Sequence, residues 1–489
     1  MRTLPVYVRF LSEATNGRKL SPGNPQNHRN MKYRFLVFTA LCAGALFTGV
    51  ATATNVEEVA RPVTQAQLAA LEARIAELEK QLAAAKAQNA STPVTSAAPV
   101  AAAPTSVTDE KLAAVTARVE KLENPTGIKL GALSIKPYGY IKLDATYDSH
   151  KPSPSTGDFS LFVLPEVSGK SDSQLDFSAR DSRFGLDFAL PEEHGITATA
   201  KAEIDFVING SESAYSVRLR HSYVNLAFGE GWSVLAGHSW DAFFYVAPVT
   251  LDAGFLGDAG YLYSRRAQLR LSKLADLGGG SKLTARVAVA KTASGDLDGL
   301  GQDDGLDSAR PTVEALLALD TPFLSSKPTK ISIGGEFGTE TVDAAGNPDA
   351  KNYDSRLLVA GLFLPLTEKI ALQGNLWTGE NLDGWLGGIG QGVNTTLGTS
   401  VAAKGGWAQV VLNPTARWNV NLGYGVDDPD DADLNAGGRA KNTRLFFNAF
   451  YKLTKTVTLA AEYSVIKTDY KGAADATDNR VQFTTHYQF

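Results

Sequence analysis

The sequence has almost no cysteine and only one long hydrophobic run. Cys42 is the single cysteine among 489 residues, and it lies within that run, at residues 31–53. A disulfide-stapled domain and a paired-cysteine metal site are therefore excluded. The mean hydropathy of -0.12 leaves no room for several apolar helical spans. The net charge of -5 is mildly acidic and gives no reason to expect a nucleic-acid partner.

The hydrophobic run has the layout of a secretory signal. Lys32 and Arg34 precede the apolar stretch, and Ala51-Thr52-Ala53 provides a cleavage site of small residues. We therefore expect residues 31–53 to be a signal peptide and residues 1–30 to be a misassigned start. The small residues at the end of the run argue against an uncleaved membrane anchor. Loss of both segments would shift the net charge from -5 to about -11, because they carry seven basic residues and one acidic residue.

The segment that follows the signal has helical periodicity. Residues 64–89 place leucine and isoleucine at alternating spacings of three and four, which is the pattern of a coiled coil. A spacer rich in Pro, Ala, Ser and Thr occupies 91–106, and a second short heptad segment stops at Asn124-Pro125. Residues 54–124 are thus predicted to form a periplasmic coiled-coil stalk that promotes oligomerisation. A single flexible linker is the alternative.

From Gly131 onward the hydrophobic period changes to two. In ITATAKAEIDFVI, residues 196–208, isoleucine, alanine and phenylalanine alternate with threonine, lysine, glutamate and aspartate. A strand face that carries lysine, glutamate and aspartate cannot be a dry core. One face of each such strand must therefore meet water while the other is apolar.

Sixteen such strands can be drawn between residues 133 and 489, and their connections alternate in length. Short turns include 191–195, 366–369 and 453–456, whereas the long connections are 149–173, 244–259, 295–308, 342–352, 382–402 and 429–440. An open edge is not tolerated in lipid, and an even strand count lets the last strand pair with the first. The fold class is therefore all-β: residues 125–489 are predicted to form a 16-stranded antiparallel transmembrane β-barrel, with a short α-helical coiled coil before it. A soluble sandwich would not need a second face so rich in charge.

The parity of each strand identifies the side chains that face the lumen. In SVRLRHSYV, for example, Arg218, Arg220 and Ser222 alternate with Val217 and Leu219. The basic candidates for lining the pore are Lys142, Arg183, Lys201, Arg218, Arg220, Arg266, Arg270 and Arg286. Such a ladder would offer an anion repeated charge and bidentate donors. Structural pairing with carboxylates on adjacent strands is an equally good interpretation.

The connection FYVAPVTLDAGFLGDAG at 244–260 differs from the acidic loops elsewhere. It is long, apolar and contains glycine, so we expect it to fold into the lumen and constrict it. Asp252 and Asp258 would then face the basic wall across a narrow gap. Opposed charges of this kind focus a field on a charged solute.

One short segment is reminiscent of an enzyme. Gly237-His238-Ser239 resembles the start of a nucleophile elbow, but the fifth position is Asp241 and the context is a strand rather than a strand-turn-helix. The sequence contains no metalloprotease or nucleotide-binding motif. We therefore expect no enzyme, no catalytic residues, no metal and no cofactor.

The last ten residues, RVQFTTHYQF, form a strand that stops on an aromatic residue. Tyr487 and Phe489 have the apolar parity, which suits a strand that ends at the membrane interface. This ending resembles that of outer-membrane proteins, and the resemblance implies that Tyr487 and Phe489 serve as an assembly signal and that Phe489 is read by the barrel-assembly machinery.

The order of these segments resembles the DcaP-like outer-membrane porins. The resemblance is carried by the coiled coil and by PYGYIKLDATYDS, DFSARDSRFGLDF, RLRHSYV and GHSWDAF. It implies a homotrimeric 16-stranded porin with a periplasmic coiled coil, in the outer membrane of a Gram-negative bacterium. It also implies a preference for dicarboxylate-type anions.

The main functional hypothesis is passive ion transport: diffusion of small hydrophilic anions, di- or tricarboxylates, through a constricted lumen lined by arginine and lysine. The alternative is a general or structural outer-membrane protein that tethers the envelope through its coiled coil. Expected partners are outer-membrane lipids and lipopolysaccharide, the other protomers and the anionic solutes. Peptidoglycan or a periplasmic protein would be the partner of a tether.

Overall fold

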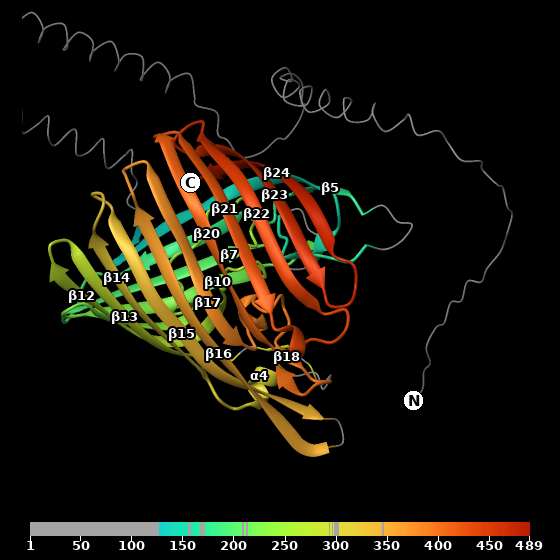
Figure 1. The fold of residues 1–489 in the computed structure, drawn as a ribbon. Helices are drawn as coiled ribbons and strands as arrows, with labels where there is room; N and C mark the ends of the chain where they lie inside the picture. The colour runs from blue at the N-terminus through green and yellow to red at the C-terminus, as the bar shows by residue number, and fades with distance from the viewer. Residues whose placement is uncertain are drawn as a thin grey trace, which may run out of the picture. The chain divides into compact units, whose positions relative to one another are not determined.

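The computed structural model describes residues 127–489, apart from 155–157, 167–171, 208–209, 212–213, 293, 296, 298–302 and 345–346. The predicted start, signal peptide and stalk lie outside the described residues. Within them, one antiparallel sheet closes into a barrel of sixteen strands (Figure 1). The last strand closes the ring by pairing with the first, with Gln488 opposite Tyr140.

Each strand of the ring pairs with the next along the chain. The second ring strand is in two parts, β5 and β6, and the short β1 (Ile128–Leu130) pairs with the start of β2. No helix in the described part of the chain is long and apolar enough to cross a membrane. The ring strands are β2 (Leu133–Asp148), β5 (Gln174–Ser178) with β6 (Arg183–Ala189), β7 (Ile196–Asp205), β10 (Arg218–Phe228), β11 (Trp232–Trp240), β12 (Arg265–Gly278), β13 (Ser281–Ala290), β14 (Thr312–Pro322), β15 (Pro328–Ala344), β16 (Asn347–Pro365), β17 (Ile370–Glu380), β20 (Ala402–Thr415), β21 (Trp418–Pro429), β22 (Arg439–Lys452), β23 (Val457–Tyr470) and β24 (Ala476–Gln488).

In the parts that the structure describes, the connections hold only short elements. They are the paired strands β3 (Pro152–Ser153) and β4 (Phe162–Val163), β8 (Gly210–Ser211) and β9 (Ala214–Tyr215), and β18 (Val393–Asn394) and β19 (Thr399–Ser400), with the helices α4 (Asp304–Asp307), η2 (Asp383–Trp385) and η3 (Asp431–Asp433).

The two faces of the strands have opposite chemistry, as the period of two predicts. On β24 the side chain of Phe483 is half exposed on the outer face, whereas its neighbour Gln482 is buried inside. This arrangement suits a barrel whose outside meets hydrocarbon and whose inside meets water and loops. Trp232 and Trp418 are on the outer face at the first positions of β11 and β21, where aromatic residues suit a membrane interface.

All sixteen predicted strands are present, with ends within six residues of the prediction. The predicted loop 342–352 is the clearest error. β15 and β16 extend through most of it as a hairpin, with Ala344 opposite Asn347. Both faces of this hairpin are polar, so the alternation that marks the other strands is missing there.

A β-bulge in β10 reverses part of the predicted parity. Leu219 is opposite Ile204 and His221 is opposite Glu203, so Arg220 is the extra residue. Arg220 and His221 are therefore both on the lumen side, and Ser222 is exposed on the outer face rather than in the lumen. Strict alternation cannot anticipate this change, because a bulge shifts the register of all residues after it.

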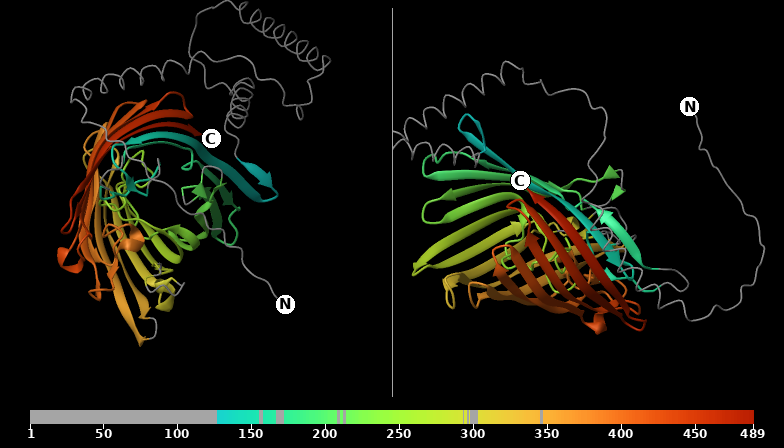
Figure 2. Two further views of the ribbon diagram at one scale, coloured as in Figure 1. Left: turned by 90° about the vertical axis from the view of Figure 1, so that its right-hand side faces the viewer. Right: turned by 90° about the horizontal axis from the view of Figure 1, so that it is seen from above.

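Two loops fold into the ring (Figure 2). Segment 241–264, between β11 and β12, buries Leu256 at 1% exposure, and segment 381–401, between β17 and β20, buries Trp385 at 2%. The loops hold each other through the backbone: the N–H of Asp258 donates to the carbonyl of Leu386 at 2.7 Å, and that of Tyr263 to the carbonyl of Trp385 at 3.1 Å. Entry of the first loop was predicted, and entry of the second was not.

The C-terminal strand ends at the barrel edge nearest the short turns. Gly139 and Phe489 exchange two backbone hydrogen bonds, of 3.2 and 3.1 Å. The ring of Phe489 lies on the outer face beside Phe184, with 6.0 Å between centroids. The aromatic end is therefore part of the seam that closes the barrel.

Candidate functional site

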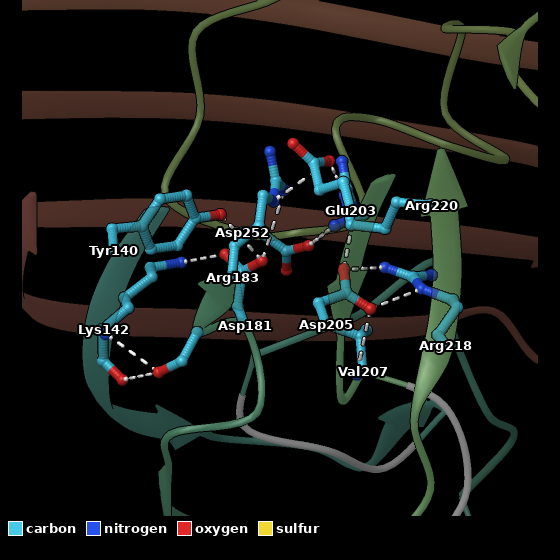
Figure 3. Close-up of polar contacts among 12 residues, drawn as sticks. Tyr140, Lys142, Asp181, Arg183, Glu203, Asp205, Val207, Arg218, Arg220 and Asp252 are labelled. Atoms are coloured by element: carbon cyan, nitrogen blue, oxygen red, sulfur yellow. Dashed lines mark hydrogen bonds and ion pairs between the residues drawn. The ribbon is translucent and has the colours of Figure 1, made fainter. Parts of the chain in front are cut away.

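Three lumen arginines form a cluster with two carboxylates, which we call the paired cluster: Arg183, Arg218, Arg220, Glu203 and Asp205 (Figure 3). Arg220 donates to Glu203 at 2.6 Å and to Asp205 at 2.7 Å. Arg218 holds the same aspartate with two bonds of 2.7 Å, because the register of β7 and β10 sets them opposite each other. These charges largely neutralise one another.

Three other lumen cations make no ion pair with any described residue; we call Arg270, Arg286 and Lys330 the unpaired group. The guanidinium of Arg270 donates to the carbonyl of Trp240 at 3.2 Å, and that of Arg286 to the carbonyls of Ala242 and Phe244 at 3.3 and 3.2 Å. These bonds orient the side chains without cancelling their charge.

The unpaired group lies on one cavity of about 490 Å³. The cavity is also lined by Lys201, which is paired with Asp187 at 2.7 Å, and by the carboxylates Glu203 and Asp241. Glu203 is already held by Arg220. The wall of this cavity formed by β12, β13 and β15 therefore presents net positive charge to the solvent.

Lys142 and Arg183 line a second cavity, of about 660 Å³. The ammonium of Lys142 donates to Asp181 and to the carbonyl of Leu251, both at 2.8 Å, and lies 3.2 Å from Asp144. Lys142 therefore ties segment 241–264 to the barrel wall. Its charge is compensated by Asp181 and Asp144.

Asp252 does not face the basic ladder across a gap as predicted. Its carboxylate is fully buried between Arg444 at 3.2 Å and Arg480 at 3.4 Å, and it accepts a bond from Ser160 at 2.7 Å. Burial raises the pKa of Asp252, but the two arginines outweigh burial and lower it below the usual value. Asp252 does line the second cavity together with Lys142 and Arg183, but its charge is held by Arg444 and Arg480, because the apolar residues of the loop pack against Trp407 and Phe446.

Asp258 is also displaced from its predicted place. It is 1% exposed beneath segment 381–401, and one of its carboxylate oxygens has no partner among the described residues. Burial raises its pKa to about 7, against a smaller opposing effect of Arg439. Asp258 therefore contributes to the contact between the two loops rather than to an open gap.

Arg266 is buried as well, although it was predicted to line the pore. It is 3% exposed, with its guanidinium 3.8 Å from the centroid of the Trp385 ring and bonded to the carbonyl of Gly384 at 2.9 Å. Segment 381–401 covers it. Since that loop was not expected in the lumen, the prediction could not anticipate this burial.

Parity could have identified three functional side chains that the sequence prediction omitted. Lys330 alternates with Ile331, and Arg444 and Arg480 each precede an outward apolar residue on their strands. The predicted ladder was confined to the first seven strands, whereas these cations are on later ones.

Ser239 and His238 are on opposite sides of β11. Ser239 is opposite Arg266 on the lumen side, and His238 is opposite Ala267 on the outer side. A serine and histidine separated by the sheet cannot form a catalytic pair. Among the described residues there is no group of three or more side chains arranged as metal ligands.

A closed barrel with an apolar exterior, a charged lumen and an in-folded loop defines an outer-membrane porin, which is a channel and not an enzyme. The sequence itself points to a family. Residues 112–296 match the model of the DcaP outer membrane protein family. This match supports the resemblance to the DcaP-like porins that the order of the segments indicated.

A solved structure of low sequence identity shares this fold. The crystal structure of the outer membrane channel DcaP of Acinetobacter baumannii has a TM-score of 0.60 and 22% identity, over 74% of this chain and 100% of that one. The anion-selective porin from Comamonas acidovorans has a TM-score of 0.48 and 14% identity, over 73% of this chain and 100% of that one. No curated protein matches the sequence.

Proposed function

We propose that the protein lets small hydrophilic anions, di- or tricarboxylates, diffuse across the outer membrane through each barrel. The observation that carries the proposal is the unpaired group: three cations on one wall of a lumen cavity with no carboxylate partner among the described residues. An anion near such a wall is favoured, and a cation is disfavoured, by Coulomb interaction in a confined space.

The chemistry of the unpaired group favours carboxylates over simple halides. Arg270 and Arg286 present planar guanidinium groups that can each hold a carboxylate with two donors. Their backbone carbonyl partners fix the orientation of both forks before a solute arrives. A solute with two or three carboxylates can engage several of these cations at once, and we expect it to slow the current of a small anion.

The test is selectivity in a planar bilayer under a salt gradient, with succinate as the added dicarboxylate. The variant R270Q/R286Q/K330Q should reduce the anion-to-cation permeability ratio at least fivefold, since one charge in water is worth about 1 kcal/mol at 4 Å. The matched control R310Q/R356Q/K327Q removes the same charge at sites that line neither cavity, and it should leave the ratio unchanged. A cation-selective parent protein, insensitive to succinate, would overturn the proposal.

We also propose that the chain is a homotrimer with a periplasmic stalk over residues 54–124. In support, the outer faces of β2, β5, β6, β7, β10 and β11 carry no Lys, Arg, Asp or Glu, and β7 presents Ala198, Ala200 and Ala202 there. Small apolar residues let two sheets approach closely. Native mass spectrometry with and without residues 54–124 tests it. Loss of trimers without loss of conductance assigns the stalk to assembly, whereas envelope defects with intact trimers would favour the tethering alternative.

A further inference from the structure

Three polar side chains form a row on the inner wall of the barrel, at the end where the chain stops (Figure 1). Lys452 of β22 is opposite Thr458 of β23, and Thr458 is opposite His486 of β24. Opposite residues on neighbouring strands have their Cβ atoms about 5 Å apart. The three residues have the parity of Asn448 and Gln482, which are buried in the lumen. We call Lys452, Thr458 and His486 the donor row.

The side chains of the donor row are free to bind a solute. None of them makes a hydrogen bond or an ion pair with a described residue. Lys452 is exposed, and the imidazole of His486 packs on the ring of Tyr140 with 4.5 Å between centroids. An ammonium, a hydroxyl and an imidazole N–H can each donate a hydrogen bond. The row therefore presents three kinds of donor and a positive charge to the lumen.

An apolar layer lies directly beside the donor row, toward the middle of the barrel. Phe450 is two residues before Lys452 on β22, and it is opposite Ala460 of β23. Both Phe450 and Ala460 line the second cavity, together with Phe255 of segment 241–264. Their apolar surface is therefore open to a solute rather than packed in a core.

Segment 241–264 closes the other side of this layer. Asn448 donates to the carbonyl of Val249 at 2.9 Å, and the N–H of Leu251 donates to Glu462 at 2.8 Å. The loop is thus fixed to the same strands, one step further from the donor row. Since the short turns of a porin are periplasmic, the donor row is on the periplasmic side of the loop.

The charges around the second cavity favour an anion. Its volume is about 660 Å³, and its lining contains two carboxylates, Asp181 and Asp252. Asp181 is held by Lys142 at 2.8 Å. Asp252 is held by Arg444 and Arg480. No described carboxylate in the lining is therefore left to neutralise the donor row.

We propose that the second cavity binds amphipathic monocarboxylates, of the class of medium-chain alkanoates. The carboxylate accepts charge-assisted hydrogen bonds from the donor row, and the alkyl chain lies on the apolar layer and leaves water. A dicarboxylate fits less well, because its second charge would lie against Phe450. The proposal rests on the proposed function only in that the solute must enter the lumen, and it concerns a different cavity from that of the unpaired group.

The first experiment varies the length of the alkyl chain. It measures the block of ion current through the full chain in planar bilayers by acetate, butyrate, hexanoate and octanoate at neutral pH. The half-blocking concentration should fall about two- to fourfold for each added methylene. Phe450→Asn should flatten this dependence, and Phe450→Leu, the matched control that keeps an apolar side chain, should preserve it. Block that is independent of chain length, or an unchanged dependence in Phe450→Asn, overturns the proposal.

The second experiment removes the donors. Lys452→Gln should raise the half-blocking concentration of hexanoate about fivefold, which is the effect of one unit charge at about 4 Å in water. Thr458→Val removes one hydrogen bond and should raise it about two- to fivefold. Lys455→Gln is the matched control, because Lys455 is in the adjacent turn and does not line the cavity. Equal effects of Lys452→Gln and Lys455→Gln overturn the proposal.

Adipate separates this site from the unpaired group. Block by adipate should be weakened by R270Q/R286Q/K330Q and changed little by Lys452→Gln, whereas block by hexanoate should show the reverse. If the proposed function fails, hexanoate still depends on Lys452 while adipate does not depend on the unpaired group. If hexanoate depends on the unpaired group and not on Lys452, the second site is overturned. Folding of each variant is verified by its heat-modifiable shift on gel electrophoresis.

Discussion

The lumen has two sets of basic side chains, each containing arginines, with opposite roles. In the paired cluster, Arg218 and Arg220 are held by Glu203 and Asp205 at 2.6 to 2.7 Å. In the unpaired group, the guanidinium groups bond only to backbone carbonyls. The first set stabilises the barrel, whereas the second leaves its charge available to a solute. The partner, and not the arginine itself, decides the role.

The largest expected effect is loss of stability when the paired cluster loses its central cation. Arg220→Met leaves two buried carboxylates without their shared partner, which costs about 3–5 kcal/mol. The measurement is the temperature at which the folded barrel band is lost on gels. Arg270→Met, from the unpaired group, is the control and should shift this temperature much less. The combined variant R220M/E203Q/D205N should recover part of the lost stability. Equal losses of stability in Arg220→Met and Arg270→Met would remove the distinction between the paired cluster and the unpaired group.

The same contrast applies to two carboxylates of segment 241–264, Asp252 and Asp258. It predicts that pH changes their contributions to stability in opposite directions. Asp258 has a raised pKa, about 7 against 3.8. Its contribution to stability is complete below about pH 4 and is lost as the pH rises to 7, on the order of 4 kcal/mol in total. Asp252 has a lowered pKa, so its contribution is present above about pH 4 and is lost in acid.

Thermal unfolding between pH 4 and pH 8 checks this pair. Asp258→Asn should reduce the decline in stability between pH 4 and pH 7. Asp252→Asn should lower stability at neutral pH and reduce the loss in acid. If both substitutions moved the pH profile in the same direction, the assignment of one carboxylate as paired and the other as unpaired would be wrong.

The smallest expected effect concerns a single cation of the unpaired group. Arg270→Gln should reduce the anion-to-cation permeability ratio by about two- to fivefold, because one charge near the path is worth about 1 kcal/mol or less in water. The reversal potential in a salt gradient measures it. Arg356→Gln, which removes the same charge from the outer face, should have no effect on the ratio, and an equal shift would show that the lumen position is irrelevant.

The fold could be predicted from the sequence because lipid requires each strand to present one apolar face. Apolar residues at every second position, with charge between them, leave no other closed arrangement, so sixteen strands and their outer faces could be predicted. The candidate site could be predicted only in part. Lys201, Arg270 and Arg286 line the predicted kind of cavity, whereas Arg266 and Asp258 are buried by a loop whose entry was not predicted.

The sequence by itself determined the barrel, its two faces, its C-terminal seam and its resemblance to the DcaP-like porins, because each of these depends on a local pattern. The tertiary structure alone decided which lumen charges are paired. It bulges β10 so that Arg220 and His221 both face inward, brings Asp252 to Arg444 and Arg480, and places segment 381–401 over Arg266. These contacts join residues far apart in the chain, and their energies depend on distance and burial, which no local pattern specifies.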